Sequence, residues 1–127
     1  MRGRGRRLFG SVVLAAALVG GATACGGDDT IEMAEAAADR QADHSFTIPL
    51  GAGEAIDAGE DIEILPAELA LEVGQVLEIV NLDDRGHLVG PFFVGEGETF
   101  RQEFVSPGTF QGICSVHPSG QFTLTVT

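Results

Sequence analysis

The sequence predicts an all-β fold: a Greek-key β-sandwich of about eight strands, preceded by a signal peptide and a flexible acidic tether. From position 45 onward, short apolar runs are separated by Gly, Pro and Asp at turn positions, which is typical of an all-β domain. Several runs alternate apolar with polar residues, as strands with one buried face do. Eight short strands within residues 45–127 suit a sandwich with Greek-key links.

The expected strands alternate most clearly in two places. Along 75–81, Leu77 and Ile79 point away from Val76 and Val80, and along 121–127 three apolar residues oppose three threonines. Turn residues separate the strands at 73–74, 83–86, 95–97 and 106–108. The eight phenylalanines supply core volume in a chain without Trp or Tyr. The eight expected strands are 45–50, 61–65, 68–72, 75–81, 87–93, 98–104, 108–114 and 121–127.

The first 24 residues have the anatomy of a signal peptide, with four arginines before an apolar run that is too short to span a membrane. Ala22-Thr23-Ala24-Cys25 resembles a lipobox, which predicts lipidation of Cys25 and a membrane anchor. The same residues also fit an ordinary signal-peptidase site, which would release a soluble protein. Residues 25–44 are acidic and rich in Ala, and predict a tether with transient helicity ahead of a domain at 45–127. The protein is therefore expected to be exported, either anchored at the outer face of the cytoplasmic membrane or periplasmic or extracellular.

The charge excludes nucleic acid as a partner. Four of the seven arginines lie in the leader, whereas all nineteen Asp and Glu residues follow it and the chain has no Lys. Phosphate binding needs clustered cations, which the mature chain would lack. The acidity favours solubility and a basic partner protein, and it equally fits a surface that is merely solvated or adapted to salt.

Three residues form the candidate metal site. If Cys25 is lipidated, Cys114 is the one free thiol of an exported protein, and such a thiol is an oxidation liability unless it is buried or bound to a metal. His117 follows Cys114 in a CxxH pattern on a tight loop between two expected strands, and His87 lies on an earlier loop. Two imidazoles and a thiolate with a weak axial ligand suit blue-copper electron transfer. The alternatives are a buried apolar Cys114, a His117 that only serves a turn, and a His87 in an ordinary polar loop.

These segments resemble the cupredoxin, or blue copper, family in its small plastocyanin-like and amicyanin-like form, here within a bacterial lipoprotein. The resemblance covers residues 61–127. Residues 66–81 are similar to the family's two early strands joined by a Val-Gly turn, and His87 matches the first ligand. Ser106-Pro107-Gly108-Thr109-Phe110, followed by Cys114 and His117-Pro118, resembles the strand and loop that carry the Cys and the second His. The resemblance implies one type I copper site with His87, Cys114 and His117 as equatorial ligands.

The axial position departs from the family pattern. The family's axial methionine would stand at Gly120 in amicyanin-like loops and at Phe122 in plastocyanin-like loops, and neither side chain can bind copper. Gln121 lies between them, and glutamine is an axial ligand in one branch of the family, so Gln121 is the axial candidate. Leu88 stands where many members have an Asn that holds the ligand loops together.

The expected function is one-electron transfer by an extracytoplasmic copper protein that is not an enzyme. Its partners would be a redox protein and, through the lipid anchor, the membrane. Two alternatives remain open: copper storage or delivery with the same ligands and an open axial position, and a metal-free cupredoxin fold that serves as an envelope interaction domain. Zinc is the second-ranked metal, because two His and one Cys with water also suit it.

Overall fold

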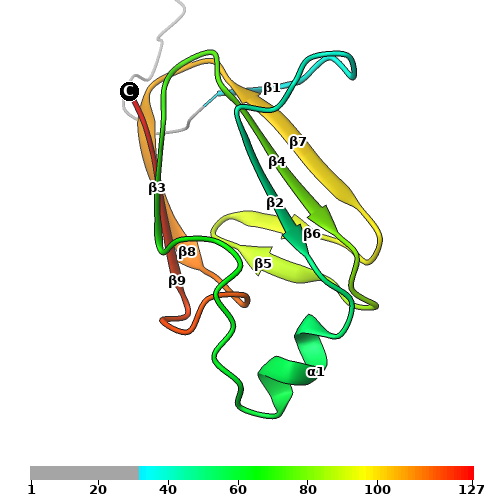
Figure 1. Ribbon diagram of the computed structural model, residues 1–127. Coiled ribbons are helices and arrows are strands. Elements are labelled where there is room, and N and C mark those ends of the chain that lie inside the picture. The colour runs from blue at the N-terminus through cyan, green and yellow to red at the C-terminus, as the bar shows by residue number, and fades with distance from the viewer. Residues whose placement is uncertain (1–31) are drawn as a thin grey trace, which may run out of the picture.

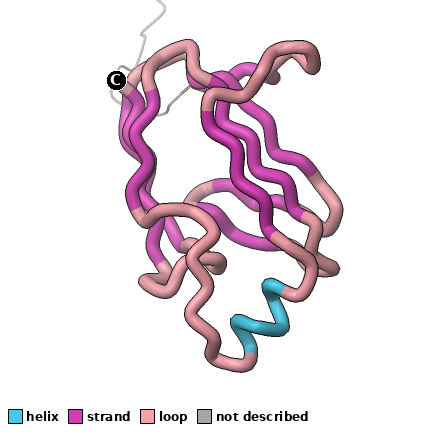
Figure 2. The backbone as a smooth tube through the Cα atoms, in the orientation of Figure 1, coloured by secondary structure: helices cyan, strands magenta, loops and turns pink. Residues whose placement is uncertain are grey.

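The described part of the chain forms two facing β-sheets and a small third sheet, with a short helix at one end (Figures 1 and 2). A computed structural model describes residues 32–127. One sheet has the strand order β1-β7-β4-β2, the second β3-β9-β8, and the third holds β5 and β6. The elements are β1 Met33–Glu35, β2 His44–Ile48, α1 Ala52–Asp57, β3 Glu68–Leu71, β4 Val76–Asn81, β5 His87–Val89, β6 Phe92–Val94, β7 Thr99–Phe104, β8 Gly108–Ile113 and β9 Gln121–Val126.

The chain passes repeatedly from one sheet to the other, so neighbours in each sheet are mostly distant in sequence. β4 pairs antiparallel with β7 and parallel with β2. β9 lies between β3, which runs parallel to it, and β8, which runs antiparallel. The predicted all-β sandwich is confirmed.

The core lies between the two large sheets and has the alternation that the sequence predicts. Leu77 and Ile79 of β4 are fully buried and belong to the core cluster, as do Phe122, Leu124 and Val126 of β9. Phe92 holds the aromatic part of this core together, since its ring lies 4.6 Å from that of Phe100 and about 6 Å from those of Phe104 and Phe110, measured between centroids.

Within residues 45–127 the structure differs from the expected elements in three places. Residues 61–65 form no strand, although Leu65 is buried, and 87–93 is divided into β5 and β6 by a turn at Gly90, whose φ is +59°. Helix α1 occupies a glycine-rich segment in which no element was expected. It begins after Gly51, whose φ of +88° is left-handed and therefore suits glycine.

The segment that was assigned to the tether contributes to the first sheet where the structure describes it. β1 pairs with β7, and β2 begins at His44 and pairs with β4. Arg40 forms an ion pair with Glu103 at 2.8 Å, and the amide of Val76 donates to Asp43. Backbone pairing and these polar contacts hold the segment on the sheet. Its composition indicated a tether because the segment has few apolar side chains.

The described part of the chain contains no helix that is long and apolar enough to cross a membrane. The predicted signal peptide, the lipidation site Cys25 and the start of the predicted tether lie outside residues 32–127.

Candidate metal centre

Strand β5 runs beside the end of β8, and this contact brings the His87 segment next to Cys114. Val89 forms an antiparallel bridge with Cys114. The amide of Ser115 donates to the carbonyl of Leu88 at 2.9 Å, and the amide of Gly90 donates to the carbonyl of Ile113 at 2.7 Å. The two chain segments that carry the first two predicted ligands are thus linked by backbone hydrogen bonds.

Gly112 permits this close approach. A Cβ atom added at Gly112 would lie 2.6 Å from the carbonyl carbon of Gly90 and 2.7 Å from its Cα. Because both obstructing atoms belong to the backbone, they cannot turn away as a flexible side chain could. A side chain at position 112 would therefore push β8 away from the end of β5.

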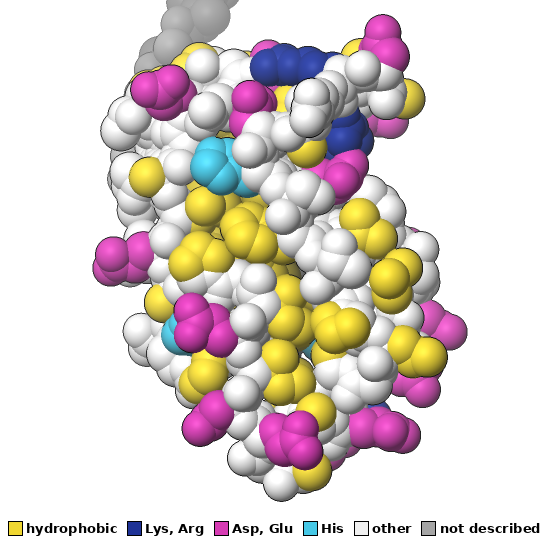
Figure 3. Space-filling view, in the orientation of Figure 1, with side chains coloured by type: hydrophobic (Ala, Val, Ile, Leu, Met, Phe, Trp, Pro, Cys, Tyr) yellow, Lys and Arg dark blue, Asp and Glu magenta, His cyan; other side chains and the backbone are white. Residues whose placement is uncertain are grey.

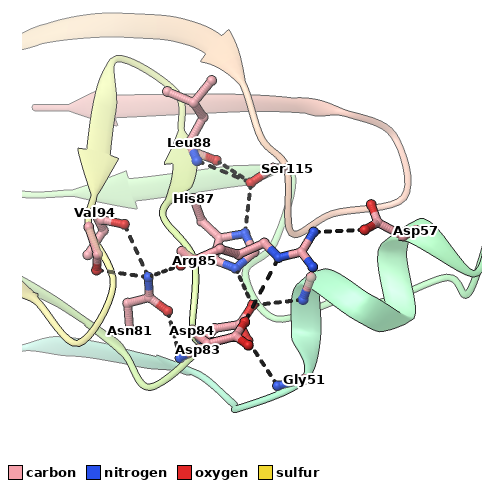
Figure 4. Close-up of polar contacts among 12 residues, drawn as sticks. Gly51, Asp57, Asn81, Asp83, Asp84, Arg85, His87, Leu88, Val94 and Ser115 are labelled. Carbon is pink, nitrogen blue, oxygen red and sulfur yellow. Dashed lines mark hydrogen bonds and ion pairs between the residues drawn. The ribbon is translucent and has the colours of Figure 1, made fainter.

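His87 is buried, with 3% of its surface exposed, and both ring nitrogens have a partner (Figure 4). Its Nε2 lies 2.7 Å from Oδ2 of Asp83, and its Nδ1 lies 3.2 Å from Oγ of Ser115. The Ser115 hydroxyl also accepts the amide hydrogen of Leu88 at 3.1 Å. Ser115 directly follows Cys114, so its hydroxyl links the His87 ring to the segment that carries the thiol.

Asp83 is a buried carboxylate surrounded by hydrogen-bond donors. Its Oδ1 accepts the amides of Gly51 and Asp84, each at 2.9 Å, and its Oδ2 accepts the amide of Gly53 at 2.8 Å. Burial alone raises the pKa of Asp83, but the hydrogen bonds with His87 and these three amides outweigh burial and hold the pKa well below its usual range. Asp83 is therefore ionised at neutral pH.

Asn81 fixes the loop that carries Asp83 and His87. The residue is fully buried at the end of β4, and its Nδ2 donates to the carbonyls of Arg85, Val94 and Gly95 at distances from 2.8 to 3.1 Å. Its Oδ1 accepts the amide of Asp83 at 2.9 Å. One amide side chain thus shapes the loop between β4 and β5 and connects it to β6.

Cys114 is a free thiol with 1% of its surface exposed. Burial raises the pKa of this thiol, and a hydrogen bond from the backbone of Val116 opposes the rise only in part. Metal-free Cys114 is therefore protonated at neutral pH and shielded from solvent. A metal ion that binds this sulfur would have to displace the proton.

His117 lies on the loop that closes the site, and its ring is turned toward its own loop. Its Nδ1 lies 2.7 Å from Oγ of Ser119 and accepts the amide hydrogen of Ser119 at 3.0 Å. The loop is tight, because the amide of Cys114 donates to the carbonyl of Gly120 and the amide of Gly120 donates to the carbonyl of His117.

The three predicted ligands come from neighbouring segments, but they do not form one cluster in the structure. Residues 32–127 contain no group of three His, Cys, Asp or Glu side chains placed to hold a metal ion. His87 and His117 line separate hollows, which share Ile56 and Ser115. The donor chemistry, one buried thiol and two imidazoles, fits copper. In the metal-free arrangement both ring nitrogens of His87 have protein partners, and Nδ1 of His117 contacts Ser119.

The predicted axial ligand, Gln121, lies at the surface in this arrangement. Gln121 is exposed at the start of β9, where it pairs with Ile113. Phe122 is buried in the core, and Gly120 has a left-handed φ of +68°. Gln121 as an axial ligand therefore stays a prediction.

Helix α1 and Arg85 cover His87, and neither was expected from the sequence. The Arg85 side chain lies against Gly53, where an added Cβ would meet it at 2.3 Å, and it forms an ion pair with Asp57 at 2.8 Å. Gly53, Asp57 and Arg85 line the hollow beside His87. In the sequence, Asp83 is one of a pair of Asp residues typical of a turn. Nothing in that pattern predicts that the Asp83 carboxylate contacts the His87 ring.

No protein-family model matches the chain, and no curated protein sequence matches it. Solved structures that resemble it are cupredoxins. A purple cupredoxin from Nitrosopumilus maritimus is 24% identical, with a TM-score of 0.43 over 67% of this chain and all of that one. Amicyanin from Paracoccus versutus is 18% identical, with a TM-score of 0.43 over 79% of this chain and 93% of that one. At these scores the likenesses carry no conclusion about the metal or the reaction of this chain.

Proposed function

We propose that this chain is an extracytoplasmic cupredoxin that binds one copper ion through His87, Cys114 and His117 and transfers single electrons. The observation that carries the proposal is the β5–β8 contact, which links the His87 segment to Cys114 and Ser115 through backbone hydrogen bonds. A bound copper would supply the change between Cu(I) and Cu(II), which a set of two His and one Cys supports in both states.

The protein groups around the copper would be rigid and shielded from water while the ion changes between Cu(I) and Cu(II). Cys114 and His87 are almost fully buried, and the loop from Cys114 to Gly120 is closed by two backbone hydrogen bonds. Ligands held on strand ends that are paired with each other change position little, which favours electron transfer over bond chemistry. His117 would have to exchange its contact with Ser119 for the metal.

The surface supports a protein partner. Acidic side chains are spread over the face shown in Figure 3, where Lys and Arg are few. Leu88, Phe93 and Ile113 are exposed apolar residues on adjoining strands near the proposed site, with Leu88 paired to Phe93 across β5 and β6. We propose that a redox protein, basic in its contact region, binds here, and that lipidated Cys25 anchors the chain at the outer face of the membrane.

A second candidate is a metal-free cupredoxin fold that acts as an interaction domain in the cell envelope. The observation that favours it is that His117 is bonded to its own loop and that residues 32–127 hold no preformed cluster of three ligands. This candidate predicts a domain that folds and binds partners equally well without copper. It shares the fold and surface of the leading proposal and differs only at the metal.

Copper titration of the protein purified without its leader separates the two candidates. The leading proposal predicts an intense visible thiolate-to-copper absorption at one equivalent of Cu(II), which Cys114→Ala abolishes and His87→Ala and His117→Ala weaken or abolish. His44→Ala is the matched control, because His44 is the one histidine outside the proposed ligand set and lies on β2. If no band forms and Cys114→Ala leaves copper affinity unchanged, the metal-free candidate stands instead.

A further inference from the structure

We infer that strand β8 is an interaction surface for a second copy of this chain, in which the free edges of two β8 strands pair antiparallel and join two sheets into one. β8 is the outer strand of the second sheet, on the side of β9 away from β3 (Figure 1). An exposed edge strand presents unpaired backbone groups that can pair with another chain. The inference goes beyond the proposed function and does not depend on copper.

The outer edge of β8 is unpaired over most of its length. Strand β5 reaches only the end of β8, because the chain turns at Gly90 and returns as β6. The carbonyl of Ile113 points to this edge, since it accepts the amide hydrogen of Gly90. The backbone groups of every second residue in a strand point the same way, so those of Thr109 and Gln111 also face this edge. Both residues are exposed, and residues 32–127 offer their backbone groups no partner there.

The surface around this edge carries no charge. Residues 105–127 contain no Asp, Glu, Lys or Arg, whereas all nineteen Asp and Glu residues of the chain lie before residue 105. Two copies of so acidic a chain repel each other unless they meet on an uncharged surface. The exposed side chains of β8, on Thr109, Gln111 and Ile113, supply such a surface and include neither the charges nor the Pro that commonly protect edge strands.

Apart from β8, the outer strands of the two large sheets present acidic side chains that would oppose a second copy. β3 begins at the exposed Glu68 and is followed by the exposed Glu72, and β1 has only three residues and ends at the exposed Glu35. On β2, the hydroxyl of Ser45 donates to the carboxylate of Glu78 at 3.0 Å. Electrostatic repulsion therefore favours β8 over these strands as the contact between two copies.

The position of the free edge fixes the register of the pair. The turn at Gly90 occupies the edge beside Ile113, so the free part is centred on Phe110. A two-fold axis at Phe110 places Thr109 of each copy opposite Gln111 of the other, where their amides and carbonyls can exchange hydrogen bonds. Phe110 is only partly buried in the single chain and meets its own counterpart across the new pair. Because the two strands run antiparallel, the two proposed copper centres lie at opposite ends of the dimer.

Sedimentation equilibrium of the metal-free chain from Gly26 onward tests the pairing, because this protein lacks Cys25 and cannot be linked by a disulfide there. We expect the mass to rise from monomer to dimer with protein concentration. The dimer should become tighter as salt screens the repulsion between the two acidic chains. A monomer at all concentrations up to the millimolar range, in high salt as well as in low salt, would overturn the inference.

A proline at position 111 tests the edge itself. Gln111→Pro removes the amide hydrogen that faces the second copy and no hydrogen bond within the chain. We expect the dissociation constant of the dimer to rise about 10- to 100-fold, because the symmetric contact loses this bond twice. Gln111→Thr is the matched control, since it keeps the amide and should dimerise as the natural protein does.

Circular dichroism shows whether Gln111→Pro folds. If it does not fold, Thr109→Glu takes its place, because it adds an acidic side chain to the same edge and should weaken the dimer as well. Unchanged dimerisation of the folded variant would contradict pairing through β8.

Hydrogen exchange measured by NMR locates the contact. The amides of Thr109 and Gln111 should exchange rapidly in the dilute monomer and slowly in the concentrated dimer. Slow exchange already in the dilute monomer would show that another segment of the same chain covers the edge, which overturns the inference. Rapid exchange that persists in the dimer would place the contact elsewhere and would overturn it too.

Discussion

Nε2 of His87 lies 2.7 Å from Oδ2 of Asp83, and both side chains are almost completely buried. A buried anion is costly unless donors surround it, and here the ring and three backbone amides supply them. The pair is therefore both a part of the fold's stability and the element that holds one proposed copper ligand.

The first prediction concerns acid stability. Because the pKa of Asp83 is lowered in the folded state, its contribution to stability is present above the unfolded pKa of about 3.9 and is lost as pH falls below it toward the folded value. Asp83→Asn should remove part of the acid-induced loss of stability and lower the unfolding free energy at pH 7 by about 3 kcal/mol, the size expected for breaking a buried pair.

Urea unfolding of the metal-free protein between pH 3 and pH 7 measures this effect. Asp84→Asn is the control and should change stability by no more than about 0.5 kcal/mol, because its carboxylate is exposed. Equal pH profiles for Asp83→Asn and the natural protein would show that Asp83 does not carry this dependence.

The second prediction concerns the reactivity of Cys114. Burial and a raised pKa both keep the thiol protonated and inaccessible, so the folded metal-free protein should react with iodoacetamide at pH 8 far more slowly than the urea-unfolded chain does. Raising the pH should speed the reaction, because more thiolate forms. Mass spectrometry follows the modification, and similar rates in the folded and unfolded chains would contradict the burial of Cys114.

The third prediction concerns the contact between β5 and β8. Gly112→Ala places a methyl group against the backbone of Gly90, so we expect a loss of about 1–3 kcal/mol of stability and weaker copper binding, as the two ligand-bearing segments separate. Gly95→Ala is the matched control, because the atoms nearest to its Cβ belong to the flexible Glu98 side chain and not to the backbone. Thermal unfolding and copper titration measure both effects. Equal behaviour of the two variants would show that the close approach at Gly112 is not required.

The fourth prediction concerns the axial position. If Gln121 leaves the surface to bind copper, Gln121→Met should raise the reduction potential, because a thioether favours Cu(I) more than an amide oxygen does. Cyclic voltammetry of the copper-loaded protein measures the shift. A potential that stays at the natural value would exclude Gln121 as a ligand.

Much of the fold follows from the sequence, because alternation in strands is a local pattern. The alternating faces of β9 agree with the prediction, and in β4 Leu77 and Ile79 are buried as expected, although Val76 on the opposite face is buried as well. β8 and β9 end close to their expected limits. Helix α1 was missed because it is only six residues long and contains glycine, so its apolar pair Ala52 and Ile56 is too short a pattern to indicate a helix. The helix is held by core packing of Ala52 and Ile56 and by contacts with Asp83 and Arg85, which are about thirty positions away in the sequence.

The residue types of the proposed metal centre are a prediction from the sequence, and their arrangement could not be predicted. The CxxH pattern and His87 indicate copper chemistry, but the sequence does not show that Asp83 would be buried behind His87. It also does not show that Ser119 would engage His117. Both contacts depend on how loops pack, which spacing along the chain does not encode.

X-ray absorption at the copper edge, on the natural protein loaded with one equivalent of copper, tests the proposed centre most directly. We predict one sulfur and two imidazoles around the copper, with the sulfur lost in Cys114→Ala and one imidazole lost in His87→Ala. A copper environment made only of oxygen and nitrogen in the natural protein would contradict the proposal that Cys114 and the two histidines form the metal centre.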